Sequence, residues 1–213
     1  MNQSGSQGER DLKDRLLDLA LAGGDCVGVV GLAKNCGKTT TLNALIGAAA
    51  GRKIAIGITS GGRDGELCDA ITGLPKPPIN VPRGALIAMA DFTIGRTSCQ
   101  LEIVQRLGIH TTAGEIVIAR ARSSGQVEVI GCNRASDLVR AISQMQKLGA
   151  ELTLVDGAAG RTFLASPDVV GAFVLAAGAT LDTDARGIAE ATRMAVHIFT
   201  LPPPSPAAAS RAR

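Results

Sequence analysis

The stretch at residues 26–46 constrains the fold of this chain more than any other part of its sequence. It reads CVGVVGLAKNCGKTTTLNALI, in which an apolar, β-branched run predicts a buried strand. From Leu42 onward, apolar residues recur at helical spacing and predict a helix with one buried face. Gly37-Lys38-Thr39 closes the loop between the two elements. A strand, a glycine-containing loop and a helix in direct succession predict a phosphate-binding loop of the Walker A type.

Each residue of this loop has a physical role in that interpretation. Gly37 lets the backbone approach a phosphate, and the N–H groups of the loop and the following helix form an anion cradle. Lys38 supplies a positive charge to the outer phosphates, and the Thr39 hydroxyl holds Mg²⁺. An ordinary strand-to-helix turn with a surface lysine is the alternative. The residues predicted to bind the nucleotide are Ala33, Lys34, Asn35, Cys36, Gly37, Lys38, Thr39 and Thr40.

Two later strands are expected to bring carboxylates to the same edge of the sheet. Residues 151–156 form a hydrophobic run ending in Asp156, and residues 53–60 form a run followed by a glycine-rich loop with Asp64. Ligands bind at the carboxyl ends of strands in open α/β sheets, so both carboxylates can reach Mg²⁺ there. Glu66 is an alternative to Asp64, and a solvated turn is the other interpretation of this loop. The predicted catalytic residues are Lys38, Asp64 and Asp156, and the predicted metal ligands are Thr39, Asp64 and Asp156.

Composition limits the class of protein. With 213 residues, 46% of them hydrophobic, the chain suits one compact α/β domain. The absence of Trp and Tyr and a net charge of only +3 argue against nucleic-acid and membrane partners. Five widely spaced cysteines without a C-x-x-C pair indicate reduced thiols in the cytoplasm. A polar start and the lack of a long apolar run predict a soluble cytoplasmic protein without signal peptide or membrane span.

The remaining patterns predict a three-layer α/β/α fold with a mostly parallel sheet. The predicted P-loop domain covers residues 11–201, between a disordered start at 1–10 and a disordered Pro/Ala tail at 202–213. Residues 67–95 are expected to form an irregular insertion, mainly loops, over the active-site edge. Further helices are expected at 11–22, 97–107, 136–148 and 182–195. Further strands are expected at 171–177 and 196–201, with a β-hairpin, or a strand leading to an edge strand, at 115–122 and 126–130.

The spacing inside the loop departs from the common Walker A pattern. Five residues, instead of four, separate Gly31 from Gly37, and Leu32 stands at the usual glycine position. This spacing resembles dethiobiotin synthetase and cobyrinate amidase, which share their fold with the nitrogenase iron protein and the signal-recognition GTPases. The resemblance implies a P-loop NTPase. In that wider class a signature lysine reaches across a dimer to the partner's nucleotide, and Lys34 is the candidate for this role. A solvated lysine or a local phosphate contact is the alternative for Lys34, which lies one position later than in that pattern.

A narrower resemblance rests on the segments GLAKNCGKTTTLNALI, TSGGRDGE, DAITGLPKP, VPRGALIA, VDGAAGR and ASPDVVGAFVLAAGA. Together they resemble the small nucleotide-binding reactivase subunits of lysine 5,6-aminomutase and ornithine aminomutase. This resemblance implies Mg²⁺-dependent hydrolysis of a nucleoside triphosphate that drives reactivation or remodelling of a cobalamin-dependent aminomutase. A second reactivase subunit or a second copy of the chain is a further implied partner. Carried over from the dethiobiotin synthetase branch, Thr39, Asp64 and Asp156 match the residues that hold Mg²⁺, although Asp156 is usually Glu there.

Other functions stay open at this point. An ATP-dependent carboxylate ligase of the dethiobiotin synthetase type needs a lysine besides Lys38 near the γ-phosphate, and Lys34 and Lys53 are the available candidates. A GTPase switch resembling a metallochaperone, and a degenerate P-loop protein with only a structural role, are further alternatives. Residues 133–137 match the Asn-Lys-x-Asp guanine-recognition motif poorly, so ATP is favoured over GTP.

Overall fold

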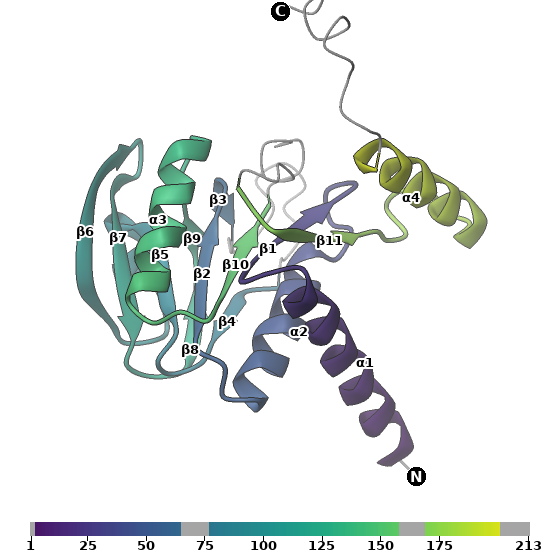
Figure 1. Ribbon diagram of the computed structural model, residues 1–213, viewed down its shortest axis with the longest axis horizontal. Helices are drawn as coiled ribbons and strands as arrows, with labels where there is room; N and C mark the ends of the chain where they lie inside the picture. Colours follow the sequence, from purple (N-terminus) through teal and green to yellow (C-terminus); the bar gives the residue numbers. More distant parts are fainter. Residues whose placement is uncertain (1–2, 65–76, 158–168, 201–213) are drawn as a thin grey trace, which may run out of the picture.

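The structure is a computed structural model that describes residues 3–64, 77–157 and 169–200. It is a mixed α/β protein built on a seven-stranded sheet with the strand order β11-β1-β10-β2-β5-β7-β6 (Figure 1). The helices are α1 (Gln3–Ala22), α2 (Lys38–Gly51), α3 (Ala135–Lys147) and α4 (Ala185–Phe199), with a short 3₁₀ helix, η1 (Asp91–Arg96). The strands of the main sheet are β1 (Cys26–Gly31), β2 (Ile56–Ser60), β5 (Leu86–Ala90), β6 (Leu101–Thr111), β7 (Gly114–Ala121), β10 (Leu152–Asp156) and β11 (Ala172–Ala176). Two small ribbons pair β3 (Arg63–Asp64) with β9 (Val129–Ile130) and β4 (Ile79–Val81) with β8 (Gly125–Val127).

Parallel strands make up most of the main sheet. β11, β1, β10, β2 and β5 pair in parallel, whereas β7 is antiparallel to both β5 and β6. Every residue of β2 and of β10 is buried. Such burial is typical of parallel strands covered by helices on both faces. The prediction of an α/β fold with a mostly parallel sheet is therefore confirmed.

Helices cover both faces of this sheet, which gives three layers. On one face, Leu42 and Leu45 of α2 are fully buried and pack in a cluster with Val29 of β1. On the other face, Leu138 of α3 is fully buried in a second cluster with Val155 of β10. Each such side chain contributes about 1.5–3 kcal/mol by leaving water. α1 packs against α2, whereas α4 extends away from the sheet (Figure 1).

The strand order creates a switch point between β1 and β10. The chain runs from β1 through α2 to β2, which lies on the far side of β10. From β10 it returns to β11, which lies on the far side of β1. The two connections therefore leave neighbouring strands in opposite directions, and a crevice opens at their carboxyl ends. In open α/β sheets, this crevice is where ligands bind.

One predicted helix is a strand. The pattern at residues 97–107 predicts a helix, but this part of the chain forms β6, the outermost strand on the antiparallel side. Two register shifts, one after Ile103 and one after Arg106, offset β6 against β7. These irregularities break the two-residue alternation of a strand. Leu101, Val104 and Leu107 consequently recur every three residues, a spacing that resembles a helix face.

The pairing of the neighbouring strands also differs from the prediction. β7 pairs with β5 and β6, so the predicted hairpin with residues 126–130 is wrong, and the tight hairpin joins β6 to β7. Residues 86–90, expected in an irregular insertion, form β5, whose five residues are all buried in the main sheet. The partner of a strand depends on packing across the sheet, which an alternating pattern does not encode.

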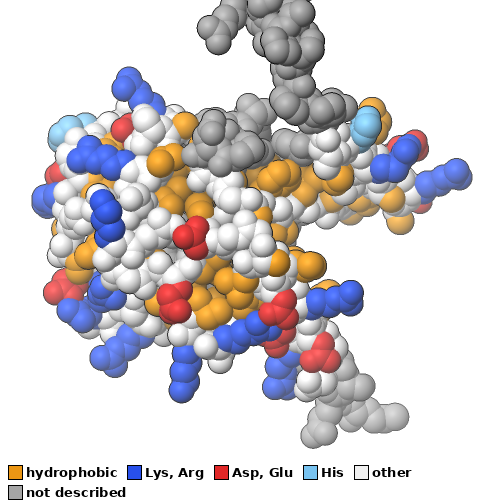
Figure 2. All heavy atoms as spheres, viewed as in Figure 1, with side chains coloured by type: hydrophobic (Ala, Val, Ile, Leu, Met, Phe, Trp, Pro, Cys, Tyr) orange, Lys and Arg blue, Asp and Glu red, His pale blue; other side chains and the backbone are white. Residues whose placement is uncertain are grey.

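The ends of the chain depart from the prediction as well. α1 begins at Gln3, so helix replaces most of the segment expected to be disordered. At the other end, α4 continues to Phe199 in place of the predicted last strand, and Figure 2 shows hydrophobic side chains exposed along it. The exposed apolar residues there are Met194, Val196 and Ile198. The predicted tail at 202–213 and residues 67–76 of the predicted insertion lie outside the described residues. Within the described part of the chain, no helix is long and apolar enough to cross a membrane.

Candidate functional site

The candidate phosphate loop, residues 32–37, joins β1 to α2. Gly37 precedes the helix with φ = 96°, a left-handed conformation that favours glycine. Gly37 has no side chain that could accept a hydrogen bond from the first N–H groups of α2. Unsatisfied N–H groups and the positive end of the helix dipole attract an anion. The backbone of the loop is therefore suited to binding an anionic group.

Lys38 folds back over the loop that precedes it. Its Nζ donates a hydrogen bond to the carbonyl oxygen of Ala33 at 3.2 Å. The side chain passes over Gly31, where a Cβ atom would lie 2.7 Å from the Lys38 Cγ and 2.5 Å from the Cys36 Sγ. Because a larger residue at position 31 would displace the lysine, the end of β1 requires glycine. The lysine is thereby held beside the uncapped N–H groups of α2.

Two hydrogen bonds join the candidate phosphate loop to β11. The N–H of Leu32 donates a hydrogen bond to the carbonyl oxygen of Ala176 at 3.1 Å. The same oxygen accepts a hydrogen bond from the Cys36 Sγ at 3.3 Å. Cys36 is only 4% exposed, so its side chain packs inside the loop. Leu32, at the position where the common pattern has glycine, is therefore held by its own backbone against the edge of the sheet.

Asp156 ends β10 next to this loop. It is 1% exposed and is the only charged side chain among the buried residues that the structure describes. It pairs in register with Val29 of β1 and lies on the same strand face as Leu154, which packs in the cluster with α2. The side chain therefore points to the face that α2 covers. Strand geometry puts its Cα about 8 Å from that of Gly31, at the start of the candidate phosphate loop.

Ser60 belongs to the same group and was missed from the sequence. It ends β2, is fully buried and pairs in register with Asp156. Ile58, two positions earlier, packs in the cluster with α2, so Ser60 shares that face of the sheet. A hydroxyl at this position can donate a hydrogen bond to a carboxylate or a phosphate. The two-residue period of the strand, counted back from its end, was the signal that could have found it.

The predicted metal ligands are only partly described. The backbone of Asp64 pairs with Val129 of β9, but the side chain of Asp64 and the whole of Glu66 lie outside the described residues. Thr39 is half-buried in the first turn of α2. Its hydroxyl and the Asp156 carboxylate are hard oxygen donors on one side of the sheet, which fits Mg²⁺. No three His, Cys, Asp or Glu side chains gather into a metal site among the described residues, but Mg²⁺ bound with a nucleotide takes most of its ligands from water and phosphate.

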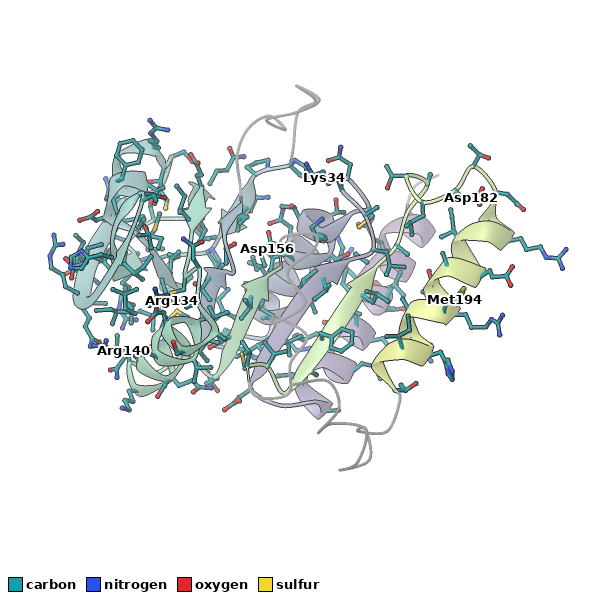
Figure 3. The ribbon with its side chains drawn as sticks, turned by 90° about the horizontal axis from the view of Figure 1, so that it is seen from above. Lys34, Arg134, Arg140, Asp156, Asp182 and Met194 are labelled. Carbon is teal, nitrogen blue, oxygen red and sulfur yellow. The ribbon has the colours of Figure 1, made fainter. Side chains whose placement is uncertain are left out.

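The two further lysines lie in different places. Lys34 is exposed on the candidate phosphate loop, while Asp156 lies near the middle of the molecule (Figure 3). Asn35 beside it has φ = 56° and, like Thr40 on α2, is exposed. Lys53 follows the last residues of α2, about 20 Å of helix away from the loop. Lys53 therefore does not reach the candidate site, which leaves Lys34 as the lysine available to a ligase mechanism.

The described cysteines are packed thiols. Cys26, Cys36, Cys99 and Cys132 are free and buried. Burial raises the pKa of Cys26 and that of Cys132 to about 12. Such thiols stay protonated and unreactive near neutral pH. Cys68 lies outside the described residues.

Comparison with known proteins does not add to this geometry. No protein-family model matches the sequence, and no curated protein matches it.

Proposed function

We propose that this protein binds a nucleoside triphosphate with Mg²⁺ at the candidate phosphate loop and hydrolyses it, as a P-loop NTPase. The observation that carries the proposal is the convergence of three features at the β1–β10 switch point. These are the uncapped N-terminus of α2, the side chain of Lys38 folded over Gly31, and the buried carboxylate of Asp156 on the α2 face. An anion cradle, a fixed cation and a metal-binding carboxylate are the parts that phosphoryl transfer requires.

The proposed role of each residue follows from its position. The N–H groups of the loop and of α2 hold the phosphates, and Lys38 neutralises the charge that they carry. Thr39 and Asp156 hold Mg²⁺, directly or through water, and Asp64 is the further proposed ligand. Ser60 lies beside Asp156 and orients the groups around the metal. Mg²⁺ held by Thr39 and Asp156 would lie near the ends of β10 and β2, and a terminal phosphate bound to it would lie toward those strands.

The output of hydrolysis is conformational in this proposal. ATP is the preferred nucleotide, since the chain has no good match to the guanine-recognition motif. The partner is a cobalamin-dependent aminomutase that the protein reactivates, as the resemblance of the loop segments implies, and a second copy of the chain or a second subunit takes part. The partner is tested by measuring nucleotide hydrolysis with and without an inactivated aminomutase. Stimulation of hydrolysis is expected, and an equal rate in both samples would remove the aminomutase from the proposal.

The nucleotide site is tested by calorimetric titration with non-hydrolysable Mg-ATP and Mg-GTP analogues. Replacing Lys38 by Ala is expected to weaken binding about 10- to 100-fold, because a charge-assisted hydrogen bond contributes about 1.5–3 kcal/mol. Lys147→Ala is the matched control, since this exposed lysine ends α3 on the opposite face of the sheet. Its affinity for nucleotide should equal that of the wild type. Unchanged affinity in Lys38→Ala would show that the loop is a structural turn.

A further inference from the structure

A second hollow lies on the antiparallel side of the sheet, away from the candidate phosphate loop. It is a pocket of about 1150 Å³, slightly above the range of about 300–1,000 Å³ that is usual for organic ligands. η1, β6 and the turn between β6 and β7 form its walls, and Gly62, just beyond the end of β2, closes one side. All of its lining residues belong to the described part of the chain.

The walls of the pocket carry apolar side chains that the fold leaves uncovered. Phe92 of η1 is 56% exposed, and Ile103 of β6 is 40% exposed. Ile94 and Ile130 line the pocket with them. The guanidinium of Arg96 lies 4.4 Å from the centre of the Phe92 ring and holds one face of the ring by a cation–π contact. Exposed apolar groups gathered in a concavity gain free energy when an apolar body covers them.

The charged groups in the pocket carry opposite charges and are joined by hydrogen bonds. Arg106 donates hydrogen bonds through Nη1 to Asp91 at 3.3 Å and to Glu115 at 2.7 Å. Asp91 and Arg106 are the only charged side chains among the lining residues, and their charges are opposite, so the lining has no formal net charge. A charged ligand would lose its hydration in this pocket, and no net opposite charge in the lining would compensate for that loss. The wall still offers hydrogen-bond donors and acceptors to a polar group.

We propose that this pocket is a binding site for a small, uncharged organic molecule with a flat apolar body and a hydrogen-bonding group. The apolar body lies against Phe92 and Ile103, and the polar group meets the Arg106–Asp91 pair. The site does not depend on nucleotide binding, although it opens near the end of β2, on the side that the terminal phosphate would face. Its ligand and a nucleotide therefore occupy the same edge of the sheet without sharing residues.

The test uses indole as the probe, because the protein contains no Trp or Tyr and adds no indole or phenol emission of its own. Indole emission should shift to shorter wavelength and rise in anisotropy as protein is added. Indole-3-acetate and tryptamine carry the same ring with a negative or a positive charge, and each should bind at least threefold more weakly than indole. Tenfold tighter binding of either charged probe would overturn the proposed ligand class.

The location is tested with two matched substitutions. Ile103→Asp introduces a charge into the pocket and should weaken indole binding at least tenfold, while Val139→Asp on α3, at the same 40% exposure, should leave it unchanged. Phe92→Ala is a second pocket variant with the same expected loss, should Ile103→Asp not fold. Absence of indole binding to the wild type, or wild-type binding in the pocket variants, would overturn the proposal. Lys38→Ala should bind indole normally, so failure of the nucleotide site and failure of this site are distinguishable.

Discussion

The two halves of the sheet differ in where their charged side chains lie. In the parallel half, β1, β10 and β2 are buried between α2 and α3, and Asp156 is the one buried charge among the described residues. In the antiparallel half, exposed charges pair at the surface of the sheet, as Glu102 of β6 does with Arg122, which follows β7. A buried charge costs several kcal/mol unless it is paired and hydrogen-bonded, whereas an exposed pair costs and contributes little. The location of a carboxylate, more than its presence, therefore separates a candidate functional residue from an ordinary surface residue.

The largest effect is expected where the two halves meet. Gly131 follows β9, and its N–H donates a 2.6 Å hydrogen bond to the carbonyl oxygen of Gly62. A Cβ at position 131 would lie 1.8 Å from the carbonyl oxygen of Ser60, at the end of β2. Gly131→Ala should therefore lower the free energy of unfolding by about 3 kcal/mol or more, measured by urea denaturation.

Gly47→Ala is the matched control for this prediction. A Cβ at position 47 meets no atom within 4 Å, and the residue lies inside α2. Alanine should stabilise the helix there by about 0.5–1 kcal/mol. Equal effects of the two substitutions would show that the halves are not packed as tightly as their contacts indicate.

The parallel half was predicted well from the sequence because the patterns that define it lie within short stretches of the chain. Successive buried residues give each strand, and the loop from Gly31 to Lys38 connects neighbouring elements of the chain. Asp156 was found because the carboxyl ends of parallel strands share one edge. Ser60 was missed because the two-residue period of its strand gives only the face on which it lies, whereas its pairing with Asp156 depends on a strand that is distant in the sequence.

The antiparallel half was predicted poorly because its structure depends on distant partners. β5 follows two proline-marked segments and was expected to belong to an irregular insertion of mainly loops, yet it is buried by β2, β7 and α3, which lie elsewhere in the sequence. β6 reads as a helix because its register shifts remove the alternation that marks a strand. The pocket is formed by four separate segments of the chain, so no local pattern in the sequence predicts it.

The buried charge itself gives the second prediction. Asp156→Asn keeps the shape of the side chain but removes the charge that would hold Mg²⁺. Nucleotide affinity should lose most of its dependence on Mg²⁺, with about 30-fold weaker binding in the presence of the metal, in line with about 2 kcal/mol for a charged contact. Calorimetric titrations with and without Mg²⁺ measure this change.

Glu151→Gln provides the comparison for Asp156. Glu151 precedes β10 at its opposite end, where Oε1 accepts a hydrogen bond from the N–H of Ala55 at 2.9 Å. Glutamine can still accept that bond, and this end of the strand is far from the candidate site. The Mg²⁺ dependence should be that of the wild type, and an effect equal to that of Asp156→Asn would assign the loss to net charge alone.

A smaller effect is expected at the contact between α2 and β4. Asn43 donates a hydrogen bond from Nδ2 to the Pro78 carbonyl oxygen at 2.8 Å and accepts one at Oδ1 from the Asn80 N–H at 2.9 Å. Asn43→Ala should lower the free energy of unfolding by about 1.5 kcal/mol, because two hydrogen bonds are lost. Thr40→Ala, an exposed position on the same helix, should change it by less than about 0.5 kcal/mol. Equal stabilities of the two variants in urea would contradict a role for Asn43 in joining helix and ribbon.

The smallest effect concerns an exposed pair of the antiparallel half. The hydrogen bond from Arg106, and that from the Gly108 N–H, lower the pKa of Glu115 from its ordinary value of 4.5. A carboxyl group with a lowered pKa in the folded state stabilises the fold above pH 4.5, and this contribution is lost as the pH falls through the lowered value. The melting temperature of the wild type should exceed that of Glu115→Gln slightly at pH 6, and the two should converge below pH 4.5. A constant difference across this range would show that the glutamate acts by packing.

The irregular pairing of β6 also affects how molecules meet in solution. An unbroken edge strand presents a row of free N–H and C=O groups onto which another chain can add, and this is a common route to aggregation. β6 is interrupted after Ile103 and again after Arg106, and Gly108 has φ = 65°. Exposed Glu102 adds a charge along the same strand. A straight strand from a neighbouring molecule therefore finds no continuous template at this edge, and the sheet resists growth into a fibril from its antiparallel side.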